Sequence, residues 1–290
     1  MKAKSKSVSS QVRRVTGKSN RVDPEGREDV GNSNADAVSA SWPYPRLAAH
    51  RCGGILAPEN TLAGFDACVR NGYRMVEFDA KLSADDEIYL LHDDTLDRTT
   101  NGHGPAVERT WQELSQLDAG SWFSPAFAGV RLPTLAEAAA RCASDGIVAN
   151  IEIKPCPGRE VETGHLVARA ALDLWRAQTQ PLLSSFSFEA LAAARDAAPS
   201  LPRGMLFEDV PHDWLRIVRE LDCVSLHADH KQLSPQLVAE IHAAGLRVLA
   251  YTVNDLHRAR EIAEWGVDTI CTDCIDKIGA GAVTAFPASR

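Results

Sequence analysis

Short segments rich in Val, Ile and Leu alternate with longer segments of helical periodicity after Pro45. The short segments predict buried strands, because aliphatic runs bounded by turn residues suit sheet positions, at 47–51, 75–80, 147–153, 181–186, 203–208, 223–228, 247–253 and 269–272. The longer segments predict helices at 61–71, 134–144, 160–178, 188–197, 213–221, 235–244 and 255–265. Thr134, Ser187 and Ser234 are expected N-caps, and Gly146 is expected to end a helix.

This alternation predicts an α/β fold around a parallel sheet. Strands that are apolar throughout are buried on both faces, as in parallel sheets covered by helices. Eight such strands with helices between them predict a closed (β/α)8 TIM barrel. A doubly wound open sheet is the alternative, and the lack of a GxGxxG sequence after the first strand disfavours it.

Residues 81–133 interrupt the alternation and are expected to form an insertion after the second strand. Asp85 and Asp86 lie between two strand-like runs and predict a hairpin turn, which would return residue 92 opposite residue 78 or 79. The remainder mixes Gly, Pro and aromatic residues with one short predicted helix at 110–117. We expect the insertion on the upper face of the barrel, where the loops after the strands build active sites.

Composition and charge narrow the class of protein. The chain has 290 residues, 44% hydrophobic and 24% charged, with a formal net charge of −8. This charge disfavours nucleic acids and anionic membranes as partners. The sequence also lacks an apolar stretch long enough to predict a membrane-spanning helix. Composition and charge therefore indicate no nucleic-acid or membrane partner, and the sequence leaves self-association open.

The charge is unevenly distributed along the chain. Residues 1–46 carry nine basic and five acidic groups, a net +4, which leaves −12 on the remaining residues. We expect residues 1–45 to form a disordered basic tail, with an organelle transit peptide as the alternative. Residues 46–290 are then expected to form one barrel domain that includes the insertion at 81–133.

The seven cysteines are scattered and odd in number. Without a secretory signal, this pattern indicates reduced thiols and a cytoplasmic protein rather than a disulfide framework. Cys271 and Cys274 form a CxxC pair at the end of the last predicted strand. That pair has no second pair for zinc and does not precede a helix, so we interpret it as incidental.

Carboxylates recur at matching positions on two neighbouring predicted strands. Glu77 and Asp79 are two residues apart and share one face, and Glu152 and Lys154 have the same spacing on the next strand. A carboxylate inside a barrel is costly unless it is paired or binds a metal. Oxygen ligands suit Mg²⁺ or Ca²⁺ rather than zinc. A structural ion-pair network around Lys154 is the alternative, and the spacing alone leaves both open.

Two histidines are expected at the same rim. His50 ends the first predicted strand and is followed by Arg51, and the predicted hairpin brings His92 next to Asp79. Two histidines near a metal would suit acid–base cleavage of a phosphodiester, in which one removes a proton from the attacking oxygen and the other protonates the leaving alcohol. Arg51 and Lys154 would offset charge on the phosphoryl oxygens. His227 and His230, at the end of another strand, are interpreted mainly as structural.

Several sequence motifs together resemble a known family. They are HRCGGILAPENT (50–61), MVEFDAKLS (75–83), LLHDDTLDRTTNG (91–102) and ANIEIKP (149–155), continued by LLSSFS (182–187), CVSLH (223–227), YTVN (251–254) and GVDTICTD (266–273). In this order and spacing they are similar to the glycerophosphodiester phosphodiesterase family, and most of all to its bacterial cytosolic branch. The resemblance extends over about residues 47–278.

The resemblance implies a TIM barrel with a segment inserted after the second strand. It implies hydrolysis of a glycerophosphodiester to sn-glycerol 3-phosphate and an alcohol, with Mg²⁺ or Ca²⁺ required. The implied site comprises the catalytic residues His50, His92 and Arg51, the metal ligands Glu77, Asp79 and Glu152, and the substrate-binding residues Arg51 and Lys154. Glu59 and Asn60 are expected to brace the loop that carries His50.

One position departs from the family pattern, because Cys52 stands where the family usually has glycine. A positive φ at that position would strain a cysteine, unless Gly53 and Gly54 form the turn instead. Cys52 lies next to Arg51, which predicts a lowered thiol pKa and activity that is sensitive to oxidation.

Two other functions remain as alternatives. One is a related barrel phosphodiesterase with another substrate, such as a lysophospholipase D or a phosphoinositide-cleaving enzyme. The other is a barrel that binds phosphodiesters without cleaving them. The complete set of candidate catalytic residues favours an active enzyme, and the choice of head group, of Mg²⁺ or Ca²⁺, and of which histidine is the acid stays open.

Overall fold

Eight parallel strands form a closed barrel in the computed structural model, which describes residues 42–279 and residue 281. The strands are β1 (Leu47–Ala49), β2 (Met75–Leu82), β4 (Val148–Ile153), β5 (Leu182–Ser185), β6 (Arg203–Phe207), β7 (Ser225–Asp229), β8 (Arg247–Tyr251) and β9 (Thr269–Thr272). β1 pairs with both β9 and β2, which closes the sheet. The predicted TIM barrel is therefore confirmed, and the open sheet is wrong.

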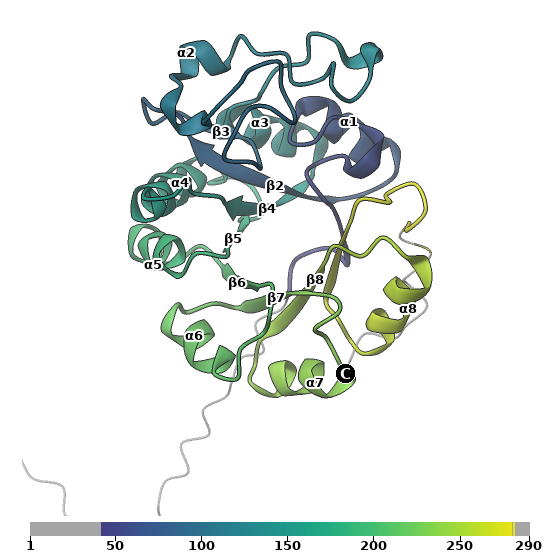
Figure 1. The fold of residues 1–290 in the computed structure, drawn as a ribbon. Coiled ribbons are helices and arrows are strands. Elements are labelled where there is room, and N and C mark those ends of the chain that lie inside the picture. Colours follow the sequence, from purple (N-terminus) through teal and green to yellow (C-terminus); the bar gives the residue numbers. More distant parts are fainter. Residues whose placement is uncertain (1–41, 280, 282–290) are drawn as a thin grey trace, which may run out of the picture. The chain divides into compact units, whose positions relative to one another are not determined.

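Helices surround the barrel on its outer side (Figure 1). They are α1 (Leu62–Arg70), α3 (Leu135–Asp145), α4 (Glu160–Leu174), α5 (Phe188–Ala197), α6 (Trp214–Glu220), α7 (Pro235–Ala243) and α8 (Leu256–Glu264). The three predicted N-caps are confirmed, because the side chains of Thr134, Ser187 and Ser234 accept hydrogen bonds from backbone amides of the first helical turn. Gly146 ends α3 in the left-handed conformation, as expected.

The main hydrophobic core lies between the strands and the helices. Side chains that point outward from the strands, such as Phe78 and Ile151, pack there against helical residues such as Phe65 and Leu135. Each fully buried side chain of this size contributes roughly 1.5–3 kcal/mol by leaving water. No helix within the described residues is long and apolar enough to cross a membrane.

The insertion begins with the predicted hairpin. β3 (Ile88–Leu90) runs antiparallel to the end of β2, with Ala80 opposite Leu90, and the Leu91 amide donates to the Asp79 carbonyl at 3.1 Å. This register places residue 91 opposite Asp79 and residue 92 opposite Phe78, as the hairpin predicted. The rest of the insertion contains the short helix α2 (Trp111–Leu114) and the 3-10 turns η2 (Ala106–Glu108) and η3 (Pro125–Phe127), and it packs around its own small core that includes Tyr89 and Leu114.

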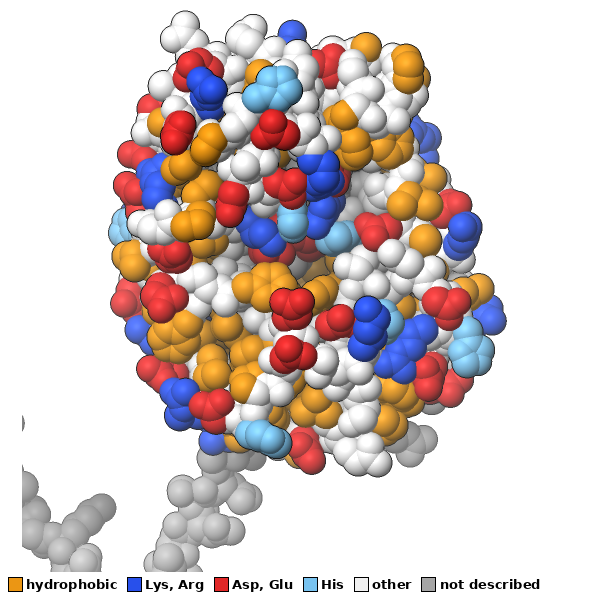
Figure 2. All heavy atoms as spheres, in the orientation of Figure 1, with side chains coloured by type: hydrophobic (Ala, Val, Ile, Leu, Met, Phe, Trp, Pro, Cys, Tyr) orange, Lys and Arg blue, Asp and Glu red, His pale blue; other side chains and the backbone are white. Residues whose placement is uncertain are grey.

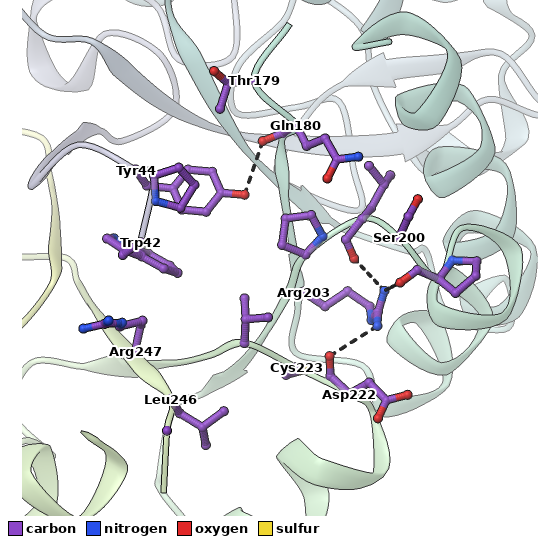
Figure 3. A pocket seen from close by; sticks show the side chains of 16 residues that line it. Trp42, Tyr44, Thr179, Gln180, Ser200, Arg203, Asp222, Cys223, Leu246 and Arg247 are labelled. Atoms are coloured by element: carbon purple, nitrogen blue, oxygen red, sulfur yellow. Dashed lines mark hydrogen bonds between the residues drawn. The ribbon is translucent and has the colours of Figure 1, made fainter. Parts of the chain in front are cut away.

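The start of the described chain closes the end of the barrel where the strands begin. Tyr44 is buried and donates to the Gln180 carbonyl at 3.2 Å, and the Trp42 ring nitrogen donates to Thr269 at 3.0 Å. Residues 42–45 are therefore part of the barrel, whereas the rest of the expected tail lies outside the described residues. A cavity of about 690 Å³ adjoins them, lined by Trp42, Tyr44, Arg203 and others (Figure 3).

Barrel-facing side chains become polar toward the other end of the barrel. Leu182, Leu249 and Met75 fill the interior near the strand starts. His227 lies fully buried further along β7, with Nε2 2.9 Å from Ser225 Oγ. Its ring occupies the space that a side chain at Gly204 would need. His227 is thus a buried barrel residue, and burial lowers its pKa to about 3.

Replacement of His227 tests this burial through the pH dependence of stability. The unfolded chain protonates this imidazole near pH 6.5 and the folded chain only near pH 3, so the stability that it contributes is present above pH 6.5 and is lost as the pH falls. In His227→Gln, the loss of unfolding free energy between pH 6.5 and about 4 should be smaller by up to about 3 kcal/mol. Urea denaturation at several pH values measures this, and parallel curves for wild type and variant would contradict it.

Candidate active site

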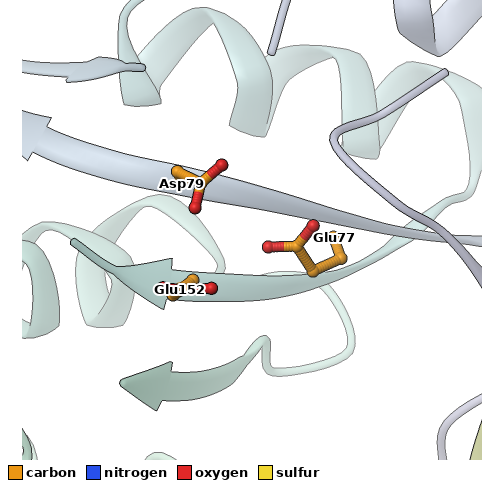
Figure 4. Close-up of side chains that lie close together, drawn as sticks. All are labelled: Glu77, Asp79 and Glu152. Carbon is orange, nitrogen blue, oxygen red and sulfur yellow. The ribbon is translucent and has the colours of Figure 1, made fainter. Parts of the chain in front are cut away.

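Three carboxylates lie together inside the barrel near the carboxyl ends of two neighbouring strands. Glu77 and Asp79 point inward from β2 and Glu152 from β4 (Figure 4), and strand pairing places Asp79 beside Glu152. Each of the three offers an oxygen atom within 4.8 Å of those of the other two. All three are buried, so their mutual repulsion is only weakly screened by water.

The local charges do not fully neutralise this triad. Burial and the charge of Asp79 raise the pKa of Glu77 to about 8 and that of Glu152 to about 7. Burial alone would raise the pKa of Asp79 as well, but Lys154, together with other nearby cationic groups, lowers it overall. The Lys154 ammonium lies 2.7 Å from Glu152 and 3.9 Å from Asp79. Part of the alternative ion-pair network is therefore present.

Glu77 is the carboxylate in which this ion-pair network leaves one oxygen without a partner. Its Oε2 accepts from the Arg51 amide at 3.0 Å and lies 3.8 Å from His50. Its Oε1 is buried and has no hydrogen-bond partner among the described residues. An unpaired buried carboxylate oxygen beside two further carboxylates is the donor set that a hard divalent cation prefers. The triad therefore fits Mg²⁺ or Ca²⁺.

The loop between β1 and α1 is held in an unusual backbone conformation. Arg51, Cys52 and Asn60 have φ values of 48°, 73° and 56°, a region that non-glycine residues adopt at a cost of about 1–3 kcal/mol each. Hydrogen bonds to β2 support the loop. The Asn60 side chain donates to Asp79 at 2.8 Å and accepts from its amide at 3.1 Å. Asn60 thus braces the loop, as predicted.

Cys52 itself adopts the positive φ that was expected of the family glycine. Gly53 and Gly54 do not relieve it, although Gly54 is also left-handed. The cysteine side chain fits because Gly64 faces it; a β-carbon at Gly64 would come within 2.7 Å of Cys52 Cβ.

The predicted lowering of the Cys52 thiol pKa is wrong. The side chain is fully buried, and burial together with the nearby Glu77 raises its pKa well above the ordinary value. A buried, protonated thiol is not a good target of oxidants. All seven cysteines of the chain are free thiols, in agreement with the expected absence of disulfides.

His50 is oriented by a carboxylate from the last strand. Its Nδ1 lies 2.6 Å from Asp273 Oδ1, and Asp273 in turn accepts from the Asn254 side chain at 2.8 Å. A carboxylate can only accept, so Nδ1 donates and Nε2 is the nitrogen left for chemistry. Burial lowers the pKa of His50, but the hydrogen bond to Asp273 and the charge of Glu77 outweigh it and raise the pKa overall.

His92 has an equivalent arrangement near Asp79. Its Nδ1 lies 2.7 Å from Asp93 Oδ1, which again leaves Nε2 available. Burial lowers the pKa of His92, and the neighbouring Asp79 only partly offsets this. The two histidines therefore share the same geometry, a ring held by an aspartate at one nitrogen, as catalytic imidazoles commonly are.

Two cationic side chains complete the site. Arg51 donates from Nη1 to Glu59 at 2.8 Å and places Nε 3.8 Å from Asp79, and that Nε is buried without a hydrogen-bond partner in the described part of the chain. The Lys154 ammonium lies 5.4 Å from the centre of the Phe186 ring. Both groups can donate to an anion that approaches the carboxylates.

The site opens to the surface at the carboxyl ends of the strands. Basic, histidine and acidic side chains gather around a hollow at the centre of this face (Figure 2). A cavity of about 560 Å³ lies beside it, lined by residues that include Glu152, Lys154, Phe186 and Phe188. A small organic phosphate can therefore reach the carboxylates and extend toward this cavity.

The structure brings together every residue that the sequence analysis assigned to the site. It adds Asp273 and Asp93, which hold the two histidines, and Asn254, which donates to Asp273. Asp273 directly follows β9, at the same end of the barrel as the other acids, so its position at a strand end was an available signal.

Comparison with known proteins supports a specific family. Residues 50–277 match the model of the "Glycerophosphoryl diester phosphodiesterase family". The chain is 35% identical over 239 residues to the YhdW protein of Bacillus subtilis, covering 80% of this chain and 96% of that one. It is 33% identical over 232 residues to the glycerophosphodiester phosphodiesterase of Caldanaerobacter subterraneus, covering 78% and 93%. These relatives are bacterial, in agreement with the expected branch.

A solved structure extends the likeness to the whole barrel. The phosphodiesterase of Oleispira antarctica, determined in complex with its product sn-glycerol 3-phosphate, has a TM-score of 0.77 and 36% identity, and the likeness covers 83% of this chain and 97% of that one. The family match over residues 50–277 includes the carboxylate triad and the two histidines. The chain belongs to the glycerophosphoryl diester phosphodiesterase family.

Proposed function

We propose that this enzyme hydrolyses glycerophosphodiesters to sn-glycerol 3-phosphate and an alcohol in a metal-dependent reaction with two catalytic histidines. The observation that carries this proposal is the buried triad of Glu77, Asp79 and Glu152, with His50 beside Glu77 and His92 near Asp79. Family membership and the product bound to the Oleispira relative support the substrate class. The free thiols fit a cytoplasmic enzyme.

The triad would hold the cation. Three buried carboxylates, one with an unpaired oxygen, provide the hard oxygen ligands of Mg²⁺ or Ca²⁺. When bound, such an ion neutralises developing charge on phosphoryl oxygens. Arg51 Nε and the Lys154 ammonium lie at the edge of the same triad, so we expect them to donate to the non-bridging oxygens of the substrate and to orient it.

The histidines would move the protons. One imidazole Nε2 accepts a proton from the oxygen that attacks phosphorus, which is either water or the neighbouring glycerol hydroxyl. The other donates a proton to the oxygen of the departing alcohol as its bond to phosphorus breaks. Asp273 and Asp93 keep both Nδ1 atoms as donors, so only Nε2 exchanges protons. The departing alcohol would extend toward the cavity that Phe186 and Phe188 line.

Removal of the metal should abolish the reaction. We expect glycerol 3-phosphate release from glycerophosphocholine or glycerophosphoethanolamine, measured with a coupled assay, to stop in EDTA and to return with Mg²⁺ or Ca²⁺. In Asp79→Asn, the metal concentration required for half-maximal activity should rise at least about tenfold, because a charged ligand is lost. Asp213→Asn, which removes a carboxylate paired with Arg216 at the surface, is the control. EDTA-resistant release would refute metal dependence, and an unchanged metal titration in Asp79→Asn would refute the ligand assignment.

Replacement of His92 tests the acid–base role. His92→Ala should reduce kcat by about 10²–10⁴-fold, the usual contribution of a positioned acid or base, while the circular dichroism spectrum and Tm stay close to those of the wild type. His103→Ala is a matched control from the same insertion, because His103 also contacts an aspartate, Asp97, through Nδ1 at 3.0 Å but is 83% exposed. Equal activity of the two variants would contradict the role of His92.

A further inference from the structure

Arg98 in the insertion joins two carboxylates of the active-site rim. Its Nε and Nη2 donate to Asp93 at 2.6 and 2.8 Å. Its Nη1 and Nη2 donate to Glu59 at 2.7 and 2.8 Å. Asp93 belongs to the insertion and Glu59 to the loop between β1 and α1. One guanidinium therefore bridges two segments that are 39 residues apart in sequence at that contact.

Both carboxylates also hold a residue of the proposed reaction. Asp93 Oδ1 accepts from His92 at 2.7 Å, and Glu59 Oε1 accepts from Arg51 Nη1 at 2.8 Å. These are the two oxygens that Arg98 Nη2 contacts. The result is a continuous series of charge-assisted hydrogen bonds from one imidazole, through Arg98, to the guanidinium of Arg51.

The planar guanidinium of Arg98 fixes the orientation of both carboxylates that it bridges. Two parallel hydrogen bonds to one carboxylate fix its plane as well as its position. Without Arg98, the Asp93 side chain keeps its bond to His92 but loses the contacts that set its rotamer. Glu59 likewise keeps only its bond to Arg51. Small shifts of an acid–base group or a phosphate donor reduce catalysis strongly, because the reacting atoms must be aligned.

We propose that Arg98 is a positioning residue that holds His92 and Arg51 in one fixed relative geometry across the insertion and the β1–α1 loop. The proposal rests on the proposed function for the roles of those two side chains. The opposing interpretation is a surface ion pair with little effect, since the Arg98 side chain is 44% exposed and such pairs contribute about 0–1 kcal/mol.

The chain offers a matched control for that interpretation. Arg109 lies in the same insertion, is also 44% exposed, and pairs with Glu113 at 3.9 Å away from the carboxylate triad. We expect Arg98→Ala to lower kcat/KM about 10–100-fold, the range for partners that orient a functional side chain, and Arg109→Ala to stay within about twofold of the wild type. Millimolar guanidinium chloride should restore much of the activity of Arg98→Ala and should not stimulate the wild type.

A spectroscopic readout is independent of turnover. Proton NMR should show a downfield Nδ1–H signal of His92 in the wild type, assigned by its absence in His92→Ala. In Arg98→Ala this signal should shift or broaden, and guanidinium should restore it. Hydrolysis by the wild type tests the proposed function. The kcat/KM of Arg98→Ala relative to Arg109→Ala, together with the His92 signal, tests the bridge.

Each outcome decides the proposal. Activity of Arg98→Ala equal to that of Arg109→Ala overturns it, as does a loss of activity with an unchanged His92 signal and no rescue. If Arg98→Ala does not fold, Arg98→Lys is the deciding variant, since lysine keeps the charge but not the fork. A loss of at least about tenfold in Arg98→Lys supports the bridge, and activity near that of the wild type overturns it.

Discussion

The burial of three carboxylates within 4.8 Å of one another is the constraint on which the rest of the site depends. Burial disfavours the charged form of each carboxylate, and like charges at this distance repel strongly. Both effects raise the pKa values of Glu77 and Glu152, which is a cost of ionisation at this site. Lys154 and Arg51 reduce it, yet one oxygen of Glu77 stays unpaired. This charge balance fits the bound cation of the proposed function. Such a cation would explain how an acidic protein can take an anionic substrate.

The loop after β1 supports the carboxylate triad, and its backbone is strained in doing so. Three non-glycine residues, Arg51, Cys52 and Asn60, are left-handed there. Hydrogen bonds from this loop to Glu77 and Asp79 offset the strain. The left-handed backbone at Arg51 thus lets its side chain lie beside Asp79 while its amide donates to Glu77. Strained residues of this kind concentrate at functional sites.

Much of the fold was predictable because strand-like and helix-like segments alternate regularly along the chain. The order of the elements followed from the continuous apolar strands and from helix caps such as Ser187. The turn at Asp85–Asp86 predicted the register of the hairpin, and the period of two placed Glu77 and Asp79 on one face. The strand end and the hairpin placed His50 and His92 at the same rim, and the family motifs then implied their roles. Asp273 also lies at a strand end, but its contact with His50 spans 223 residues and was not evident from the sequence. The role of Arg98 could not be assigned, because it comes from a contact across 39 residues of sequence. The thiol pKa of Cys52 was predicted in the wrong direction, because proximity in sequence to Arg51 did not reveal its burial.

Calorimetric titration with Mg²⁺ or Ca²⁺ tests the central claim most directly, since it needs no substrate. At neutral pH, in two buffers of different ionisation enthalpy, the account predicts one bound ion per chain and the release of protons, because carboxyls with pKa values near 7 and 8 must ionise to bind it. Glu77→Gln should bind the ion much more weakly, at a Tm no lower than that of the wild type, because the neutral amide relieves the repulsion within the triad. The absence of binding to the wild type, or equal binding by Glu77→Gln, would contradict the account.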